Sequence, residues 1–486
     1  MMISRIGAAL ALSAAPVAAW AEIAPRTYLE ELTALYAAQG IALTHGDVQD
    51  QGDGVLVPSV MLASEGPDTA MEIALGDMTI RPTMAPGYDL EVLTAPQATG
   101  TVTGTAPDAP AAEIELTMTL EGSYWVGGAE NARKIELAYP AIDVTMDIAS
   151  EADLNMQLDM GFQDTAGTIG YALSDRSIDY RVAAGRVTAE VTVPETDGAA
   201  ADISATYDDV QITSQAVLTD TTDPLAIYAT DMLTTAELTA ASSAIGFRLT
   251  GAGPEITGTL TGGSSGLDIG VGAGGLDYAI SGEAVDVDVQ GGALPVPVIG
   301  SMARYLTRIA LPVIPDEDLS DIVLDVSIED LTLDDALWGL FDPGAAIPRD
   351  PVSLRLDLTA QGRALTNVMT PEEAMPGEMP YEFGSVSLNT LELRGAGVDI
   401  SGSGQADILN DGPFPQPVGA VDLRIAGLGG LLDTLSASGL VGPGQLLPVQ
   451  IMLGTFAQPT DESDVFTSRI EADAEGRITA NGVALQ

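Results

Sequence analysis

Apolar side chains recur at every second position through residues 133–160, and this alternation constrains the fold more than any other feature of the chain. The apolar positions are odd-numbered before Pro140 and even-numbered after it, in the order Ile135, Leu137, Tyr139, Ile142, Val144, Met146, Ile148, Leu154, Met156, Leu158 and Met160. Acidic and amide side chains separate the last four of them. This period of two is typical of strands with one apolar face and one wet face.

The same alternation recurs almost to the C-terminus, for example in residues 113–120, 187–193, 285–290 and 386–393. It predicts a mainly β protein, with long antiparallel meander sheets that are curved or packed face to face and a few short covering helices. The helix predictions cover residues 25–39, 225–244, 295–315, 334–341 and 428–437, with Pro25 and Pro224 near the first turns of the first two.

Glycine, proline and threonine content divides the chain into segments. Residues 94–112 are predicted to be a loop, and residues 251–282 a glycine-dense hairpin region. We expect a signal peptide at 1–21, a helix and β-meander unit at 22–215, a helix and glycine-rich hairpin unit at 216–293, and a C-terminal β unit at 294–486.

The first residues have the pattern of a secretory signal peptide. Arg5 supplies the positive charge, residues 6–17 the short apolar region, and Ala19 and Ala21 an A-x-A type site that predicts cleavage after Ala21. No later stretch approaches the roughly 20 apolar residues of a membrane-spanning helix. The chain has no cysteine, so neither disulfides nor thiolate metal sites are available. Export without disulfides indicates a bacterial periplasm.

The charge balance is strongly acidic, with 70 Asp and Glu against 18 Lys and Arg and a formal net charge of −52. Such a surface repels phosphate backbones, which excludes nucleic acid as a natural partner. It also disfavours docking on an anionic membrane face. The plain interpretation is solubility, in preference to a dedicated cation-binding role. The sequence contains no phosphate loop, and we expect no cofactor.

Catalytic candidates are few. His45 is the only histidine, so any Ser-His-Asp triad needs it, and a zinc site with two histidines is excluded. Its place in a polar turn predicts an ordinary surface residue. Residues 262–266 match the nucleophile-elbow pattern around Ser264, but the flanking segments are predicted strands, which favours a hairpin turn instead. We therefore predict no enzyme activity.

Two further motifs involve glycine and aspartate. Gly270, Gly272 and Gly275 match a dinucleotide fingerprint, but residues 276–280 are predicted to form a strand where that motif needs a helix. A nine-residue echo between 267–269 and 276–278 resembles a calcium-binding repeat, but two copies favour a glycine-turned hairpin. Asp286 and Asp288 share one side of a strand, either as a cation site or, more simply, as its wet face.

The two ends of the chain carry a resemblance. In residues 28–62 a helix ends at Gly40, a short strand follows, and a Gly52-Asp53 turn leads into an apolar strand; residues 474–477 and 481–485 form a turn and a closing strand. This arrangement resembles an uncharacterised exported domain-of-unknown-function family of Gram-negative bacteria, which is distantly similar to AsmA-like envelope proteins. The resemblance implies a lipid-facing groove and a role in the cell envelope, although no membrane anchor is predicted after the cleavage site.

The apolar rows lead to the same expectation on physical grounds. Exposed apolar patches of more than a few hundred Å² are rare, so the apolar face must be covered by helices, by a second sheet or by an apolar ligand. Predicted helix is scarce. We therefore expect either a groove for lipid, lined by Met156, Leu158 and Met160, or a dry β-sandwich core in a structural or interaction protein whose partners are envelope proteins.

Overall fold

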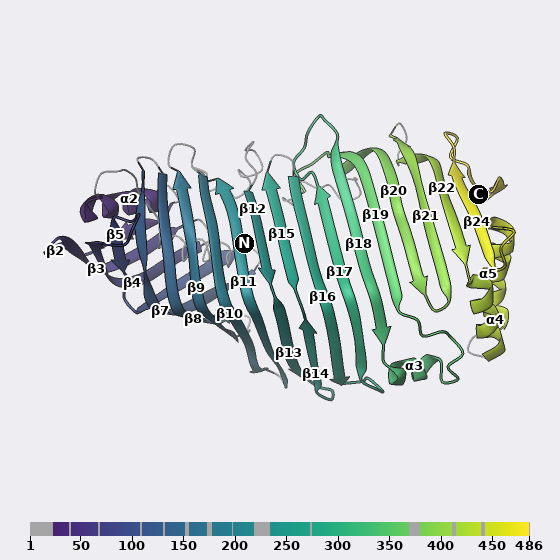
Figure 1. Cartoon of the computed structure of the whole chain (residues 1–486), viewed down its shortest axis with the longest axis horizontal. Helices are drawn as coiled ribbons and strands as arrows, with labels where there is room; N and C mark the ends of the chain where they lie inside the picture. Colours follow the sequence, from purple (N-terminus) through teal and green to yellow (C-terminus); the bar gives the residue numbers. More distant parts are fainter. Residues whose placement is uncertain are drawn as a thin grey trace. The chain divides into compact units, whose positions relative to one another are not determined.

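The computed structural model is mainly β, as predicted, with long antiparallel meanders (Figure 1). It describes residues 23–37, 40–66, 69–106, 109–129, 132–150, 155–172, 177–196, 198–217, 234–272, 275–368, 380–410, 415–438 and 443–485. The chain divides into two compact units, residues 1–259 and 260–486, here named the N-terminal unit and the C-terminal unit. The predicted signal peptide and its cleavage site lie outside the described residues.

The N-terminal unit begins with a helix, α2 (Pro25–Ala37), and continues as strands. The strands are β1 (Ala42–Thr44), β2 (Gln49–Gln51), β3 (Gly54–Glu65), β4 (Thr69–Pro82), β5 (Leu90–Leu93), β6 (Gln97–Ala106), β7 (Ala109–Ala129), β8 (Ala132–Ser150), β9 (Asn155–Ala172), β10 (Ser177–Thr196), β11 (Ala199–Val217), β12 (Thr234–Ala240) and β13 (Ser242–Thr250). Successive long strands from β7 to β11 pair antiparallel with their sequence neighbours.

Short strands share one position between longer ones. β5 and β6 lie end to end between β4 and β7, because the two ends of β4 pair with β5 and β6 in turn and β7 does the same. β12 and β13 likewise pair with successive parts of β11. Each pair of short strands therefore takes the place of one long strand, and the strand order of the meander is kept.

Helix α2 closes the start of the N-terminal unit against the strands that follow it (Figure 1). Pro25 occupies its first position, as predicted, and Gly40 with a φ of 73° follows its end. The buried face of α2 carries Tyr28, Leu29, Leu32, Leu35 and Tyr36. These side chains form one hydrophobic core with fully buried strand residues, among them Val57, Ile73, Ile80, Leu90, Tyr124 and Ile135.

The slip in alternation at Pro140 belongs to a line of irregularities that crosses four strands. Pro140 of β8, Asp164 of β9, Gly185 of β10 and Asp209 of β11 lie opposite one another along this line. The regular pairing between the strands is interrupted at these positions. Asp164 and Asp209 have φ values of 53° and 50°, a conformation that aspartate tolerates better than most residues. Each strand changes its inward-facing parity at this line, so the apolar rows stay on one side of the sheet.

The C-terminal unit is also a meander, and β14 (Ile256–Gly262) spans the division between the units in the sequence. Its strands are β15 (Ser265–Gly272), β16 (Gly275–Gly291), β17 (Val298–Leu311), β18 (Ser320–Leu333), β19 (Val352–Ala364), β20 (Tyr381–Gly395), β21 (Val398–Leu409), β22 (Gln416–Ala426), β23 (Gln458–Pro459), β24 (Val465–Ala472), β25 (Ile478–Ala480) and β26 (Val483–Ala484). From β15 to β22 each strand pairs antiparallel with the next.

Three helices accompany these strands: α3 (Asp335–Phe341), α4 (Leu428–Ser438) and α5 (Pro443–Phe456). The predicted helices at 334–341 and 428–437 are thus confirmed. The Asp334 carboxylate caps α3 by accepting from the Ala336 N–H. The Asp464 carboxylate accepts from Gly429 and Gly430 at the start of α4, at 2.9 and 2.8 Å. Helix α5 was not expected from the sequence.

Two of the helix predictions are wrong. Residues 234–244 belong to β12 and β13, while residues 218–233 lie outside the described residues. Residues 298–311 form β17. In both segments apolar residues spaced by three or four mimic a helix, but β-branched residues are frequent. Strand β11 supplies a ladder to β12 and β13, and β16 and β18 supply ladders on the two flanks of β17. Pairing with neighbouring strands therefore outweighed the helical spacing of the apolar residues.

The loop prediction for residues 94–112 is also wrong, because β6 and the start of β7 occupy most of it. Its threonines alternate as in a strand, and Gly100 allows a close approach of β4: a Cβ there would lie 2.5 Å from the Glu72 carbonyl oxygen. Residues 262–266 form no hairpin turn, since the Gly263 N–H donates to the Glu283 carbonyl oxygen of β16 and the Glu283 N–H donates to the Ser264 carbonyl oxygen. The hairpin predicted around 267–278 is confirmed by the β15–β16 ladder.

We predict that core truncation destabilises the two units unequally. Ile73→Ala in the N-terminal unit should cost about 3 kcal/mol, because Ile73 is fully buried. Leu356→Ala in β19 should cost about 1 kcal/mol, because Leu356 already contacts solvent in the folded state. The measurement uses the chain without residues 1–21, which include Trp20. Denaturant unfolding followed by Trp125 or Trp338 fluorescence, each in a variant with the other of these two tryptophans replaced by Phe, then reports on one unit at a time. Equal costs would contradict the difference in burial.

Candidate functional site

One face of the C-terminal unit is apolar across its successive strands. The register brings Ile309 of β17, Leu324 of β18 and Leu358 of β19 into one row, and the next rows repeat this pattern. We name these side chains the apolar face: Tyr278, Ile280, Ile309, Ile322, Leu324, Val326, Ile328, Leu354, Leu356, Leu358, Val386, Leu388, Leu391, Leu393, Ile400, Val421, Leu423 and Ile425. It extends over seven strands, β16 to β22.

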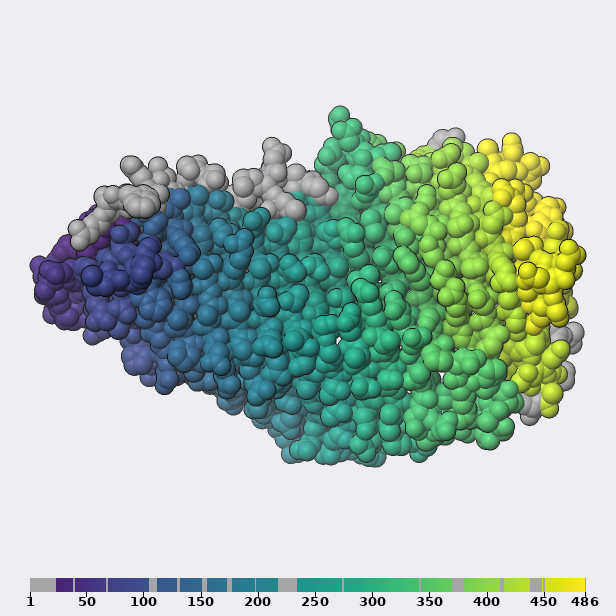
Figure 2. All heavy atoms as spheres, viewed as in Figure 1, coloured from purple at the N-terminus to yellow at the C-terminus, as the bar shows by residue number. Residues whose placement is uncertain are grey.

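The apolar face is only partly shielded from solvent. None of its side chains is among the buried residues, and Ile309 and Leu393 are each 37% exposed. In the N-terminal unit, by contrast, Ile73, Ile80 and Ile135 have no exposed area. Figure 2 shows one side of the C-terminal unit, coloured from teal to yellow, as closely packed atoms, without separating apolar from polar side chains. Partly exposed apolar surface that extends over several strands is uncommon on folded proteins, so this face is the candidate binding surface of the C-terminal unit.

The predicted lining residues Met156, Leu158 and Met160 lie in the N-terminal unit, on an apolar face formed by β8 to β13. Leu158 and Met160 pack against the hydrophobic core, and Met156 borders a hollow of about 400 Å³ together with Ile148. The row through Leu158 runs from Met146 of β8 through Val191 of β10 and Ile203 of β11 to Phe247 of β13. Exposure rises along this row, from 7% at Met146 to 39% at Ile203.

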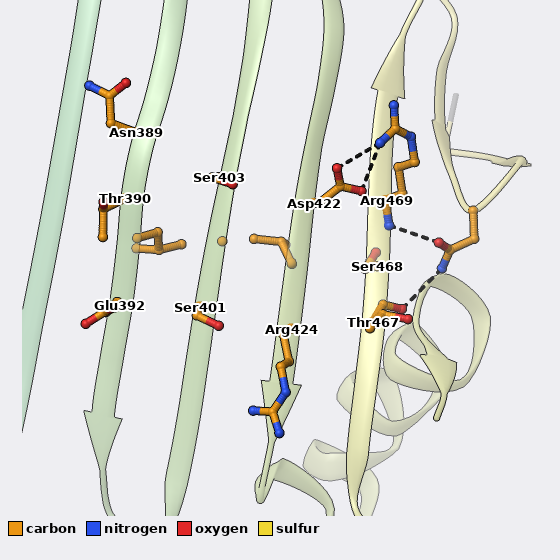
Figure 3. Close-up of a pocket in the computed structure, with 14 residues that line it drawn as sticks. Asn389, Thr390, Glu392, Ser401, Ser403, Asp422, Arg424, Thr467, Ser468 and Arg469 are labelled. Atoms are coloured by element: carbon orange, nitrogen blue, oxygen red, sulfur yellow. Dashed lines mark hydrogen bonds and ion pairs between the residues drawn. The ribbon is translucent and has the colours of Figure 1, made fainter. Parts of the chain in front are cut away.

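The opposite, polar face of the C-terminal unit has a shallow hollow of about 520 Å³ (Figure 3). Its lining residues come mainly from β20, β21, β22 and β24, and they include Leu391, Leu423 and Asn481. Ten of them are labelled in Figure 3: Asn389, Thr390, Glu392, Ser401, Ser403, Asp422, Arg424, Thr467, Ser468 and Arg469. An adjoining hollow of about 900 Å³ shares Ser403, Asp422 and Arg469 with it. Polar and charged residues thus line both hollows together with some apolar ones.

The arginines of this polar face are already paired. Arg469 donates to Asp422 at 2.7 Å and to Glu471 at 2.8 Å, and these partners raise the pKa of its guanidinium (Figure 3). Arg424 lies 3.1 Å from Glu462, and Arg477 lies 2.7 Å from Asp473. Because each cation is neutralised by a carboxylate and remains exposed, these hollows have no free cation that would attract an anionic ligand.

The catalytic and metal candidates from the sequence lie in separate places, beside or within strands. His45 is exposed, as predicted, with its Nδ1 2.7 Å from the Gly46 carbonyl oxygen. Ser264 donates to a Glu283 oxygen at 2.9 Å and is followed by a strand rather than a helix. Asp286 is exposed and Asp288 partly buried. Among the residues that the structure describes, no group of three or more histidine or acidic side chains is arranged to hold a metal ion.

A buried arginine lies at the closed end of the N-terminal unit. The side chain of Arg133, at the start of β8, is 1% exposed, and its Nη2 donates to both Glu31 oxygens of α2 at 3.3 and 3.4 Å. Its Nε and Nη1 are buried without a hydrogen-bond partner in the described part of the chain. Burial lowers the pKa of Arg133 to about 10 and raises the pKa of Glu31 to about 7, despite their mutual attraction.

Tyrosines surround the contact between α2 and the strands. Tyr28 of α2 and Tyr124 of β7 are fully buried, and the Tyr28 hydroxyl donates to the Tyr124 hydroxyl at 3.4 Å. Burial raises the pKa of both tyrosines well above the usual range. The hydroxyl of Tyr36 is buried with no partner among the described residues. The closed end therefore holds several neutral hydroxyls beside one guanidinium.

Arg133 is the residue that sequence reasoning missed. It begins the alternating segment and has the same parity as Ile135 and Leu137. The sequence did contain a signal for it: a charged residue stands at a position that continues an apolar row, and its side chain therefore faces the interior.

Comparison with protein families identifies part of the chain. Residues 233–473 match a family described as an uncharacterized protein conserved in bacteria (DUF2125). The expectation of a domain of unknown function is confirmed for this range, which includes the apolar face; residues 28–62 and 481–485 lie outside it. The comparison with curated proteins found no match. None of the helices in the described ranges is long and apolar enough to cross a membrane.

We predict that Glu31 makes the stability of the N-terminal unit depend on pH. Because folding raises the pKa of Glu31 from 4.5 to about 7, its contribution to stability is fully present below pH 4.5 and is lost as the pH rises through 7. Between pH 5 and pH 8 the wild type should lose on the order of 2 kcal/mol relative to Glu31→Gln. Unfolding followed by Trp125 fluorescence measures this, with Glu30→Gln as the control. Parallel pH profiles for wild type and Glu31→Gln would contradict it.

Proposed function

We propose that this protein is a non-enzymatic periplasmic protein that binds lipid acyl chains on its apolar sheet faces and supports biogenesis of the cell envelope. The observation that carries the proposal is the partly exposed apolar face over β16 to β22. An isolated patch of this size is unfavourable in water, and an acyl chain would cover it without requiring a second sheet. The signal-peptide pattern and the resemblance to AsmA-like envelope proteins support the same assignment.

The acidic surface fits this role. A net charge of −52 keeps a protein with a large apolar face soluble and opposes self-association, because like-charged molecules repel each other. The apolar rows at Met156, Leu158 and Met160 add a second candidate surface in the N-terminal unit. The Ser264 hydroxyl donates to Glu283, and His45 lies against the Gly46 carbonyl oxygen. The serine and the only histidine of the sequence therefore form no catalytic pair, which supports a binding role over hydrolysis.

The first experiment is mass spectrometry of organic extracts from the mature protein, purified from periplasm without detergent and compared with an unrelated exported protein. We expect near-stoichiometric phospholipid or fatty acid. Leu356→Asn, which places an amide on the apolar face, should reduce the amount of bound lipid about tenfold. Arg355→Asn changes the neighbouring residue on the opposite side of β19 and should have no effect.

The same comparison applies to the N-terminal unit, with Leu158→Asn as the test and Gln157→Asn as its control on the opposite side of β9. A lipid-free wild-type extract would contradict the proposal. It would instead favour a structural or interaction protein, and protein partners in the envelope would then be sought by crosslinking.

We also predict export with cleavage after Ala21. Small residues are required on the N-terminal side of a signal cleavage site, so Ala21→Arg should leave the precursor uncleaved, whereas Glu22→Gln should be processed normally. N-terminal sequencing of the periplasmic protein should begin at Glu22. A cytoplasmic protein with an intact N-terminus would overturn the assignment to the periplasm.

A further inference from the structure

Helices α4 and α5 contact each other near the C-terminus of the chain, beside the last strands of the C-terminal unit (Figure 1). We name them the helix pair. Asp433 is the only charged residue between Arg424 and Asp461, although 18% of the whole chain is charged and its formal net charge is −52. The helix pair is therefore an almost uncharged segment of a strongly acidic protein.

Polar contacts fasten the helix pair to the sheet. The Asp464 carboxylate caps the start of α4, and α4 contacts β21. At the end of α5 the Phe456 carbonyl oxygen accepts from the Ser468 hydroxyl at 2.7 Å and from the Asn481 side-chain amide at 2.8 Å. Ser468 pairs directly with Leu423, so its side chain is on the side of the sheet that carries the apolar face. The helix pair thus adjoins the β22 end of that face.

One side of α5 is apolar and exposed. Ile451 and Met452 are 60% and 59% exposed, more than any residue of the apolar face, and Pro448 is exposed as well. No residue of α5 carries a charge, and a helix without a charged face is normally buried. Leu432 of α4 and Ala457, directly after α5, are buried. The helix pair therefore packs on the protein with one side and leaves an apolar side open to solvent.

The charge of the protein favours a neutral lipid surface as the partner of this open side. A net charge of −52 repels an anionic membrane and a second copy of the chain. The interface of a zwitterionic membrane needs no opposite charge, and apolar helix side chains enter it readily. The Thr455 hydroxyl donates to the Ile451 carbonyl oxygen at 2.6 Å, so this polar group needs no water when it leaves solvent.

The length of α5 restricts the mode of contact. Its 14 residues extend about 21 Å at 1.5 Å per residue, whereas the hydrocarbon core of a bilayer is roughly 30 Å thick. The helix is therefore too short to cross the membrane and fits a position within the interfacial layer.

We propose that the helix pair docks the protein on the interfacial layer of a zwitterionic phospholipid membrane, with Ile451 and Met452 inserted among the lipid chains. The proposal concerns a surface outside the apolar face and does not rest on the proposed function. Docking there brings the β22 end of the apolar face close to the membrane.

A fluorescent label tests the insertion directly. The chain has no cysteine, so Met452→Cys provides a single attachment site for the environment-sensitive dye NBD on the full mature protein. Addition of phosphatidylcholine vesicles should shift its emission to the blue and raise its intensity, and brominated lipid chains should quench it. Leu365→Cys, which is 47% exposed just after β19, is the matched control and should show neither change. A label at position 452 that does not respond to the vesicles would overturn the proposal.

Cosedimentation with vesicles tests the apolar and charge arguments. Ile451→Glu combined with Met452→Glu should weaken binding to phosphatidylcholine vesicles at least about tenfold, because two apolar side chains no longer leave water. Leu365→Glu should bind like the wild type. Vesicles of equal parts phosphatidylcholine and phosphatidylglycerol should bind the wild type several-fold more weakly at low salt. Tighter binding to these anionic vesicles, or equal effects of the glutamate substitutions at the two places, would overturn the proposal.

The result is separable from the proposed function. Leu356→Asn, which should lose bound lipid, should still dock on phosphatidylcholine vesicles. Failure of the wild type to bind these vesicles would overturn docking and leave acyl-chain binding on the apolar face untouched. A response of the label at position 452 that needs no vesicles, together with a dimer in analytical ultracentrifugation, would assign the open side of α5 to a second copy of the chain and overturn the membrane as its partner.

Discussion

A strand with one apolar row must have that row shielded from water, and most of the structure follows from this constraint. The N-terminal unit satisfies it within its own chain, because α2 supplies Tyr28, Leu32 and Tyr36 to a core that the strands complete. The described strands of the C-terminal unit carry rows of the same kind without comparable burial. Helices α4 and α5 accompany only its last strands. The N-terminal unit thus shields its apolar rows from water more completely than the C-terminal unit does.

The line of irregularities across β8 to β11 shows how long strands keep an apolar side. A regular strand of nineteen or twenty residues twists continuously, and side chains of one parity stay on one face. A single-residue slip at the same level in adjacent strands preserves pairing while it bends the sheet. The slip lies at residue types that tolerate an irregular strand: Pro140, Asp164, Gly185 and Asp209. The sequence therefore favours an irregularity at this level.

The arginines differ in their environments: several are exposed and have carboxylate partners, and one is buried. Exposed arginines such as Arg469 and Arg477 are held by neighbouring carboxylates, and solvent screening keeps each such pair weak. Arg133 is the contrasting case, because its burial makes an incomplete set of partners expensive.

The sequence by itself determined the mainly β class, the slip at Pro140, the helices α2, α3 and α4, and the apolar parity of Met156, Leu158 and Met160, because these depend on local periodicity and capping. Only the tertiary structure decided that residues 234–244 and 298–311 are strands, since neighbouring strands supply hydrogen bonds that local propensity cannot register. It also decided which apolar rows are covered and that Arg133 is buried beside Glu31. Burial depends on contacts between residues far apart in the chain, 102 positions for this pair, and alternation alone does not encode such contacts.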